Sequence, residues 1–186
     1  PQYEGNRHNV AFMVIEELRR RTKAGTPKSK FGGELSEGAL ASDKVLFLKP
    51  MEFMNVSGEA TVRVAQFFKV PVDHCIAVHD ELDLPFARLK LGAGGGPGGH
   101  NGIKSLISHL GPDFKRVRVG IGRPPAGRDP AAYVLADFSR EEQKELPFLV
   151  NDAADAVEAI VARGLERAMN TWNSKKKDSQ ERKAGA

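Results

Sequence analysis

Two short apolar runs place the strongest limit on what this chain can fold into, because each is most simply a strand buried inside a sheet. The first is Val45–Leu48, which Pro50 follows and closes, and the second is Cys75–Val78. A third segment, Arg116–Ile121, alternates strictly between basic and apolar residues. Side chains alternate between the two faces of a strand, so this segment is predicted to be a strand with one basic and one apolar face.

Segments with helical periodicity lie between these runs. Val10, Val14 and Leu18 recur at helical spacing and predict a helix from Val10 to about Arg21. Ser57 offers a cap for a second helix. The intervening segment 25–38 is rich in Gly, Lys and Ser, which is typical of a loop or a short edge structure.

The last third of the chain has its own helix signals. Ser139 and Glu142 have the spacing of a capping box. An alanine-rich helix is expected after Pro147, ending near Arg163 with Gly164 as its stop. Strands that alternate with helices predict an α/β sandwich around a largely buried sheet.

The length of the chain limits it to one domain, and its composition excludes several classes of protein. The 186 residues are 40% hydrophobic and 28% charged, as in an ordinary globular domain. Cys75 is the only cysteine, which excludes a disulfide framework and a cysteine-based zinc site and fits a reducing cytoplasm. No apolar run approaches the length of a membrane span. A net charge of +4 is compatible with a polyanionic partner without indicating one.

His8 is the first candidate for catalysis. It lies directly before a predicted helix and is flanked by Asn6, Arg7 and Asn9. A neutral imidazole near a helix start has a lowered proton affinity, which suits a general base. The local context alone leaves the catalytic and the structural interpretation equally open.

A second group of candidates, His79–Asp83, follows the Cys75–Val78 strand. Functional residues gather at the carboxyl ends of strands in α/β sheets, and a carboxylate there could orient a histidine. The alternative is a turn in which acidic residues cap backbone amides. Three acidic residues could also suggest a metal site, but no second cluster of ligands supports one.

Phe53, Met54 and Asn55 follow the first strand. Asn55 could supply a hydrogen bond to substrate or water, with Phe53 and Met54 as an apolar wall. The alternative is a turn or cap at Asn55 and core filling by Met54.

Glycine is densest at Gly94–Gly102. Glycine loops let backbone amides approach phosphates closely, but neither a Gly-Lys-Thr/Ser motif nor a dinucleotide fingerprint is present, so ATP or NAD binding is not expected. A flexible gate that leads into a helix at Asn101 fits better, with a purely structural turn as the alternative.

Six basic residues lie near this loop in the sequence. Arg116 and Arg118 are expected to project from one strand face, where they could bind phosphates or simply solvate a sheet edge. Aromatic residues are sparse among them, so stacking on single-stranded bases is not indicated. The six are Arg88, Lys90, Lys104, Lys115, Arg116 and Arg118.

Taken together, the motifs resemble the bacterial-type peptidyl-tRNA hydrolase family in order and over nearly the whole chain. Any one of them would be weak, but the ordered set is specific. The matching residues are Tyr3–Asn9, Lys49–Pro50, Phe53–Gly58, His79–Pro85, Gly94–Gly102, Arg118–Gly122 and Ala168–Asn170.

The resemblance implies a single-domain α/β/α sandwich with a twisted mixed sheet. It also implies hydrolysis of the ester that joins a peptide to the terminal ribose of tRNA. His8 would be the general base that activates water, and Asp80 would orient it. An ester has a good leaving group, so a base, an orienting acid and amide donors suffice, and no G-x-S-x-G nucleophile motif is present.

The resemblance also assigns binding roles. Asn55 and Asn101 would position water and the scissile carbonyl, and three further residues would line the site for the terminal nucleotide and peptide: Tyr3, Phe53 and Met54. Contacts with tRNA phosphates would come from Arg88, Lys90 and Arg118. The partner is peptidyl-tRNA, with no metal, cofactor or membrane, and the family usually works as a cytoplasmic monomer.

The chain departs from the family pattern in places. Asn6 and Ala11 replace a threonine and a glycine, and Gly92–Ala93 lengthen the loop after Lys90, which puts the place of Lys90 in doubt. The family opens with a hydrophobic strand that ends in G-x-G-N-P-G, and the chain starts after that point. We therefore expect an N-terminally truncated domain over residues 1–173, with a polar, flexible tail over 174–186.

Two alternative functions stay open at this point. The first is a catalytically silent RNA-binding relative, similar to the chloroplast intron-splicing proteins of this fold. The presence of all four candidate polar residues, His8, Asn55, Asp80 and Asn101, argues against it. The second is a different small α/β hydrolase with no nucleic-acid partner. Salt-dependent binding of tRNA would exclude this alternative.

Overall fold

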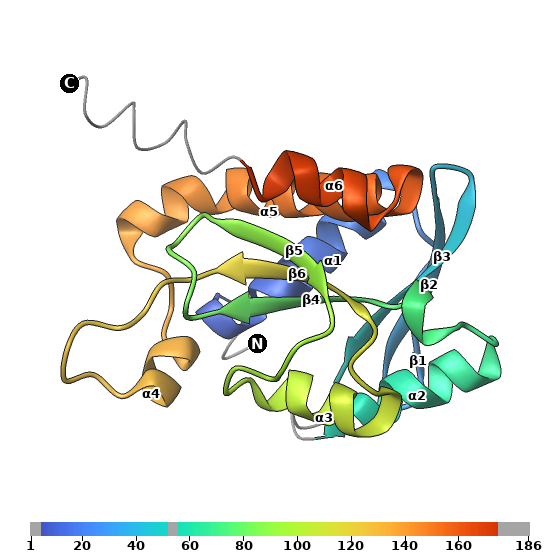
Figure 1. Cartoon of the computed structure of the whole chain (residues 1–186), viewed down its shortest axis with the longest axis horizontal. Coiled ribbons are helices and arrows are strands. Elements are labelled where there is room, and N and C mark those ends of the chain that lie inside the picture. Colours follow the sequence, from blue (N-terminus) through green and yellow to red (C-terminus); the bar gives the residue numbers. More distant parts are fainter. Residues whose placement is uncertain (1–4, 52–55, 175–186) are drawn as a thin grey trace.

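The strands of the computed structural model, which describes residues 5–51 and 56–174, form two three-stranded sheets (Figure 1). The first is antiparallel in the order β1–β2–β3, with β1 at Lys28–Lys30, β2 at Gly33–Leu40 and β3 at Asp43–Pro50. The second is mixed. Its central strand β6 (Lys115–Gly120) is parallel to β4 (Ile76–Glu81) and antiparallel to β5 (Leu89–Ala93).

Helices pack against one face of the mixed sheet and beside its β4 edge (Figure 1). One side carries α1, α5 and α6, and the core lies between these helices and the apolar face of β6. Helix α3 lies beyond the β4 edge of the sheet and packs against α2. The six α-helices are α1 (Val10–Arg21), α2 (Ser57–Phe67), α3 (Asn101–Leu110), α4 (Pro130–Leu135), α5 (Arg140–Arg163) and α6 (Leu165–Trp172), and short 3-10 helices span Arg7–Asn9 and Val72–His74.

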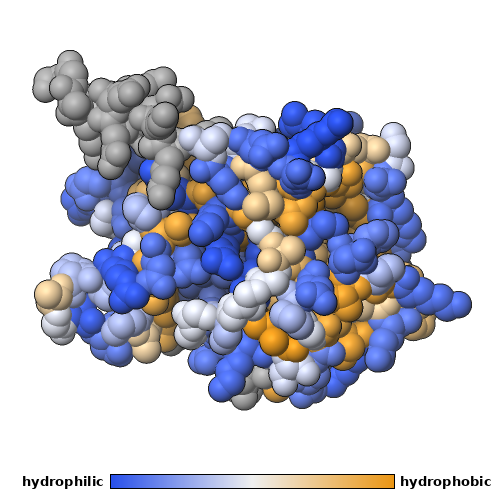
Figure 2. Space-filling model, in the orientation of Figure 1, coloured by the Kyte–Doolittle hydropathy of each residue, from blue (hydrophilic) through white to orange (hydrophobic). Residues whose placement is uncertain are grey.

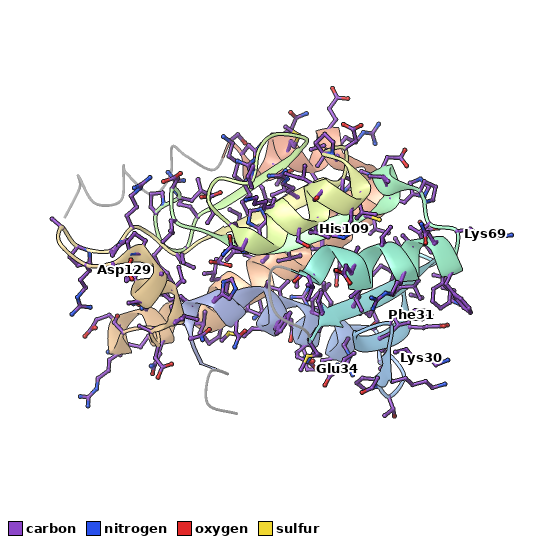
Figure 3. All side chains as sticks on the ribbon, turned by 90° about the horizontal axis from the view of Figure 1, so that it is seen from below. Lys30, Phe31, Glu34, Lys69, His109 and Asp129 are labelled. Carbon is purple, nitrogen blue, oxygen red and sulfur yellow. The ribbon has the colours of Figure 1, made fainter. Side chains whose placement is uncertain are left out.

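The predicted α/β fold with a mixed sheet is confirmed, and the first helix has the predicted bounds. The close contact of α2 and α3 depends on a glycine. A Cβ at Gly58 would lie 2.3 Å from the carbonyl oxygen of Ser105 and 2.7 Å from Nδ1 of His109. Figure 3 shows the two helices side by side, with His109 on α3.

Three expectations about elements are corrected. Segment 25–38 was expected to be a loop or a short edge structure; β1 is a short edge strand, but most of the longer central strand β2 also lies in this segment, because pairing with β3 outweighs its Gly- and Ser-rich composition. Strand β4 continues to Glu81, so His79 and Asp80 lie inside the strand. Helix α5 begins at Arg140, because the capping box starts it there and Pro147 is accommodated inside it.

The domain limits 1–173 and 174–186 and the expected truncation stay predictions, since residues 175–186 lie outside the described part. Over the ranges 5–51 and 56–174, no helix is both long and apolar enough to cross a membrane.

A cavity of about 580 Å³ lies between α1, α2, α3, β3 and β4. Its walls are mostly apolar, and His8, Asp80 and His100 form part of them. Strands β3 and β4 border it, and each pairs on one side only with another described strand. Figure 2 shows the face of the molecule that is seen in Figure 1. Hydrophobic side chains gather over the half of this face that holds α2 and α3, and hydrophilic ones over the half that holds α4.

Candidate active site

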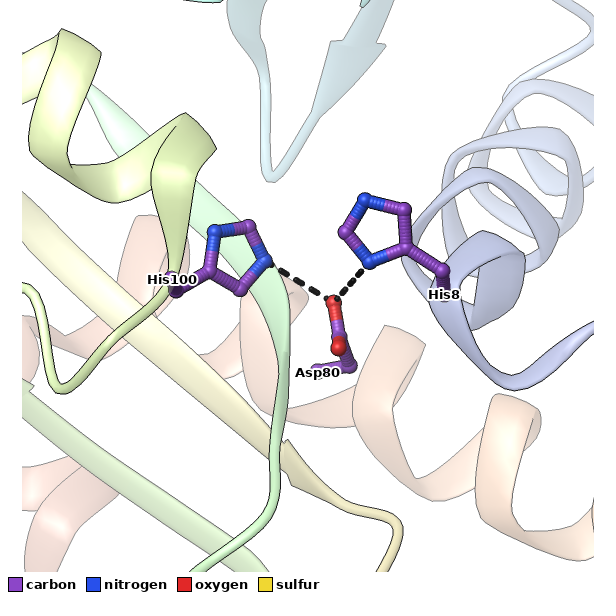
Figure 4. A group of neighbouring side chains, drawn as sticks. All are labelled: His8, Asp80 and His100. Atoms are coloured by element: carbon purple, nitrogen blue, oxygen red, sulfur yellow. Dashed lines mark hydrogen bonds and ion pairs between the residues drawn. The ribbon is translucent and has the colours of Figure 1, made fainter. Parts of the chain in front are cut away.

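Asp80 is the centre of a buried polar cluster at the carboxyl end of β4 (Figure 4). Its Oδ1 lies 3.0 Å from Nδ1 of His8 and 2.9 Å from Nε2 of His100. His8 comes from the 3-10 turn before α1, and His100 is the N-cap residue of α3. Three distant segments of the chain therefore meet at one carboxylate oxygen.

The helix cap fixes the tautomer of His100. Its Nδ1 accepts a hydrogen bond from the backbone N–H of Ile103 at 3.2 Å, so this nitrogen carries no proton. In the neutral ring the proton is then on Nε2, which donates to Asp80 at 2.9 Å. Its position as the N-cap of α3 and its bond to Ile103 therefore hold His100 in place as a donor to Asp80.

His8 is held from both sides of its backbone. The side chain of Asn6 accepts from the N–H of Asn9 at 3.0 Å and closes the 3-10 turn. Arg7 is buried and donates to the carbonyl of Asp137 at 2.8 Å and to the carboxylate of Glu142 at 2.7 Å. The second ring nitrogen of His8 points away from Asp80 (Figure 4), which leaves Nε2 free to take a proton.

The charge states follow from the same contacts. Burial raises the pKa of Asp80, but the hydrogen bonds from His100 and His8 outweigh it and hold this pKa well below its usual range. Burial lowers the pKa of His8, and the contact with ionised Asp80 more than compensates, so the pKa of His8 is raised above 6.5. Asp80 thus stays negative and stabilises the protonated form of His8.

His79 is a third histidine in the cluster. Its side chain is buried, and its Nδ1 lies 2.9 Å from the backbone oxygen of Asp80. Its ring packs edge-on against His100 with centroids 5.2 Å apart. Burial and the neighbouring His100 lower the pKa of His79 to about 4, so it is neutral at pH 7.

Donor atoms of His8, Asp80 and His100 lie within 4.8 Å of one another and match the donor types of a transition-metal site. The tautomer of His100 argues against that use. Its Nε2 would have to lose the proton it donates to Asp80 while Nδ1 still accepts from Ile103. The absence of a metal stays a prediction.

The other predicted binding residues are placed only in part. Asn101 is the first residue of α3, next to His100, and is exposed at the rim of the cluster. Tyr3, Phe53, Met54 and Asn55 lie outside the described residues, so their roles stay predictions.

The basic residues separate into two groups. Lys90 and Arg118 are direct cross-strand partners on β5 and β6, and Arg88 precedes β5. Arg116 and Arg118 lie two residues apart on β6, as expected for one strand face, but Arg116 is buried, with only 1% of its surface exposed. The glycine segment folds over Arg116, whereas Lys90 stays exposed and Arg118 partly so.

Sequence reasoning had grouped His100 only with the glycine loop and gave it no role of its own. A signal was present, since His100 and His8 both stand directly before a helix start. Arg7 was likewise noted only as a neighbour of His8, although it ties this turn to the start of α5.

Comparison with known proteins gives a consistent result. Residues 1–180 match the family model described as Peptidyl-tRNA hydrolase. The chain is 49% identical over 180 residues to a peptidyl-tRNA hydrolase of Streptomyces coelicolor, covering 94% of this chain and 90% of that protein. It is 46% identical over 173 residues to that of Mycolicibacterium smegmatis, covering 92% and 91%. The crystal structure of the Acinetobacter baumannii peptidyl-tRNA hydrolase superposes with a TM-score of 0.87 at 32% identity, covering 94% and 89%.

Proposed function

The chain belongs to the peptidyl-tRNA hydrolase family and hydrolyses peptidyl-tRNA, and we propose that His8 is the general base of this reaction. The observation that carries the proposal is the double contact at Asp80, which holds His8 at 3.0 Å and is itself held by His100 at 2.9 Å. This arrangement directs Nε2 of His8 away from the carboxylate, as a base that accepts a proton from water requires.

The proposed chemistry needs no covalent enzyme intermediate. A water oxygen attacks the ester carbonyl carbon while one of its protons passes to Nε2 of His8. The tetrahedral intermediate then collapses, the bond between the carbonyl carbon and the ribose oxygen breaks, and His8 returns the proton to that oxygen. The products are a peptide with a free carboxylate and a tRNA with a free terminal hydroxyl.

Asp80 and His100 support this proton transfer in different ways. Asp80 stabilises the imidazolium that forms on His8, as the acid of a catalytic triad does. His100 donates a fixed hydrogen bond to Asp80, so the carboxylate stays ionised and in place although it is buried. Asn101, next to His100, and Asn55 are proposed to position the water and the carbonyl oxygen.

Lys90 and Arg118 are proposed as phosphate contacts for tRNA. They are cross-strand partners, and like charges placed opposite each other destabilise a sheet. In the described part of the chain, neither is held in an ion pair with an acidic side chain. A phosphate between them would relieve this repulsion. Arg88, which precedes β5, is proposed to extend the same basic surface.

His8→Ala tests the proposed base. We expect turnover of peptidyl-tRNA to fall by about 10²–10⁴-fold, the range typical of a lost general base, with tRNA affinity nearly unchanged. His109→Ala on α3 is the matched control, since it removes an exposed histidine at the far end of that helix. Retained turnover in the His8 variant would exclude the proposed mechanism. A wild-type protein that binds tRNA but hydrolyses no peptidyl-tRNA would favour the catalytically silent alternative.

The wider setting is also proposed. Because relatives are named for action on peptidyl-tRNA, we place this enzyme in the bacterial cytoplasm, where peptidyl-tRNA is formed. We expect it to act as a monomer, because His8, Asp80 and His100 all come from one chain. A mass measurement in solution by light scattering tests this state.

A further inference from the structure

Arg116 is a buried cation whose hydrogen bonds all go to one loop. Its guanidinium donates to the carbonyl of Gly96 at 2.7 Å and to that of Gly95 at 2.8 Å. The guanidinium carbon also lies 5.0 Å from the ring centroid of Phe114. Hydrogen bonds from a charged donor are about twice as strong as neutral ones, so Arg116 holds these carbonyls firmly.

The loop that Arg116 holds has little rigidity of its own. Gly94, Gly95, Gly98 and Gly99 all have positive φ angles, between +56° and +87°. Glycine loses more conformational freedom on ordering than any other residue, so a run of glycines needs external contacts to adopt one path. Within the described part of the chain, Arg116 is the side chain that hydrogen-bonds to segment 94–99.

This loop leads directly to His100. The N–H of His100 donates to the carbonyl of Pro97 at 3.0 Å, which continues the path that Arg116 begins at Gly95 and Gly96. His100 then caps α3 and donates to Asp80. A chain of contacts thus runs from Arg116 to the carboxylate that orients His8.

The loop also lies close to Arg118 on the basic surface and to Glu81 at the end of β4. A Cβ built on Gly95 would lie 3.5 Å from the guanidinium of Arg118, and one built on Gly98 would lie 4.0 Å from the carboxylate of Glu81. Arg116 and Arg118 are two residues apart on β6, but one is buried under the loop and the other faces its edge. The two arginines should therefore have separable functions.

We propose that Arg116 is a positioning residue for the hydrolysis: by holding the carbonyls of Gly95 and Gly96 it places His100 so that its Nε2 donates to Asp80. The inference rests on the proposed roles of His8, Asp80 and His100. It assigns Arg116 no contact with substrate and no part in binding tRNA.

The first test is nitrogen-15 NMR of the histidine rings in the free protein, which requires no substrate. The variants are Arg116→Met, which removes both hydrogen bonds, and Arg116→Lys, which keeps the charge but offers a compact ammonium in place of the planar fork. We expect the hydrogen-bonded Nε2 proton of His100 to be lost in Arg116→Met and weakened in Arg116→Lys. Arg118→Met is the matched control on the same strand and should leave this signal unchanged.

The second test is a double-mutant cycle with His100→Ala, measured as kcat on a short peptidyl-ester fragment that lacks the tRNA body. Arg116→Met should lower kcat by about 10- to 100-fold, the cost of a misplaced catalytic group, with KM changed little. Combined with His100→Ala it should add almost nothing, because both substitutions remove the same contact.

Three results would overturn the proposal. One is additive loss in the cycle, which would mean that Arg116 acts independently of His100. Another is a wild-type His100 signal in both Arg116 variants. The third is a loss confined to KM with full tRNA, which would make Arg116 a phosphate contact. If Arg116→Met does not fold, Arg116→Lys carries both measurements, and a wild-type signal with wild-type kcat in it contradicts the inference.

The tests also separate this inference from the proposed function. If His8→Ala retains turnover, the proposed mechanism fails, but the NMR result still reports whether Arg116 positions His100. If His8→Ala is inactive and Arg116→Met leaves the His100 signal unchanged, only the inference about Arg116 fails.

Discussion

The contact between His8 and Asp80 predicts how activity depends on pH. Because the pKa of His8 is raised above 6.5, the acid limb of kcat/KM should lie above pH 6.5, where the base becomes neutral. Asp80→Asn removes the negative charge beside His8 but leaves His8 buried, so the pKa of His8 should fall and the acid limb should move to lower pH. Its plateau should also fall by about 10²–10⁴-fold, because the imidazolium loses its partner. A limb at the same pH in both proteins would contradict this role of Asp80.

Arg118 predicts a difference between large and small substrates. Arg118→Ala should weaken binding of full tRNA more than that of a short aminoacyl-ester fragment, because the fragment lacks the phosphates. The slope of log affinity against log salt should decrease in magnitude by about one. Lys144→Ala, which removes an exposed charge from α5, is the control and should change neither quantity. Equal losses for both substrates would remove Arg118 from this role.

The two arginines of β6 also show where prediction from sequence ends for single residues. Period-two alternation correctly placed Arg116 and Arg118 on one face and Val117 and Val119 on the other. It could not show that one arginine is buried, because the covering loop is 20 residues away in sequence. His8 and Asp80 could be proposed as site residues from the sequence because both lie in recognisable motifs, whereas His100 needed the tertiary contact.

At the scale of elements, the start of α5 and the turn that carries His8 share one carboxylate. Oε2 of Glu142 accepts from the backbone N–H of Ser139 at 2.7 Å and from Arg7 at 2.7 Å. The capping box therefore has a second role besides starting α5. It neutralises a buried arginine that lies next to the proposed base.

This shared carboxylate predicts unequal effects of two capping-box substitutions. Ser139→Ala should lower the free energy of unfolding by about 1 kcal/mol, the usual cost of a lost N-cap. Glu142→Ala should cost about 3 kcal/mol or more, because it leaves the buried Arg7 without its partner. It should also lower kcat, since the turn at His8 loosens. Urea unfolding and kcat measure the two effects, and equal losses of stability would contradict the shared role.

The bounds of elements were predictable where a local signal decides them. Helix α1 follows its apolar periodicity, and the capping-box spacing at Ser139 marks the true start of α5, although the helix itself was expected only after Pro147. The extent of β2 and β4 was not predictable from local signals, because pairing with β3 and β6 determines how far these strands run. Composition at 25–38 indicated a loop or a short edge structure, which fits β1, but it did not indicate β2, which cross-strand pairing with β3 determines.

At the scale of the whole molecule, the class of fold was predictable and the division of the strands was not. Alternating strand and helix patterns indicated an α/β sandwich, and the family resemblance implied that its sheet is mixed. Nothing local indicates that β1–β3 form a sheet separate from β4–β6, or that a cavity of about 580 Å³ lies between them. Both features arise from contacts between segments far apart in the chain.

The same buried cluster predicts how stability of the whole molecule depends on pH. His79 has its pKa lowered to about 4 by burial and by His100, against about 6.5 in the unfolded chain. Between these values the unfolded state binds a proton that the folded state does not. The contribution of His79 is therefore fully present above pH 6.5 and is lost as pH falls, at up to about 1.4 kcal/mol per pH unit. His8 acts in the opposite sense, because its raised pKa stabilises the fold below pH 6.5 and this stabilisation is lost as pH rises.

The two histidines together predict a maximum of stability near pH 6.5, and His79→Gln separates them. Glutamine does not titrate, so the variant should lose less stability than the wild type between pH 6.5 and 4, whatever its stability at neutral pH. Above pH 6.5, where His8 dominates, both proteins should show the same slope. Urea unfolding across this pH range measures both slopes. Because Asp80 and His100 contact or face His79 and remain in the variant, parallel curves below pH 6.5 would mean that the acid sensitivity comes from these neighbours and not from His79.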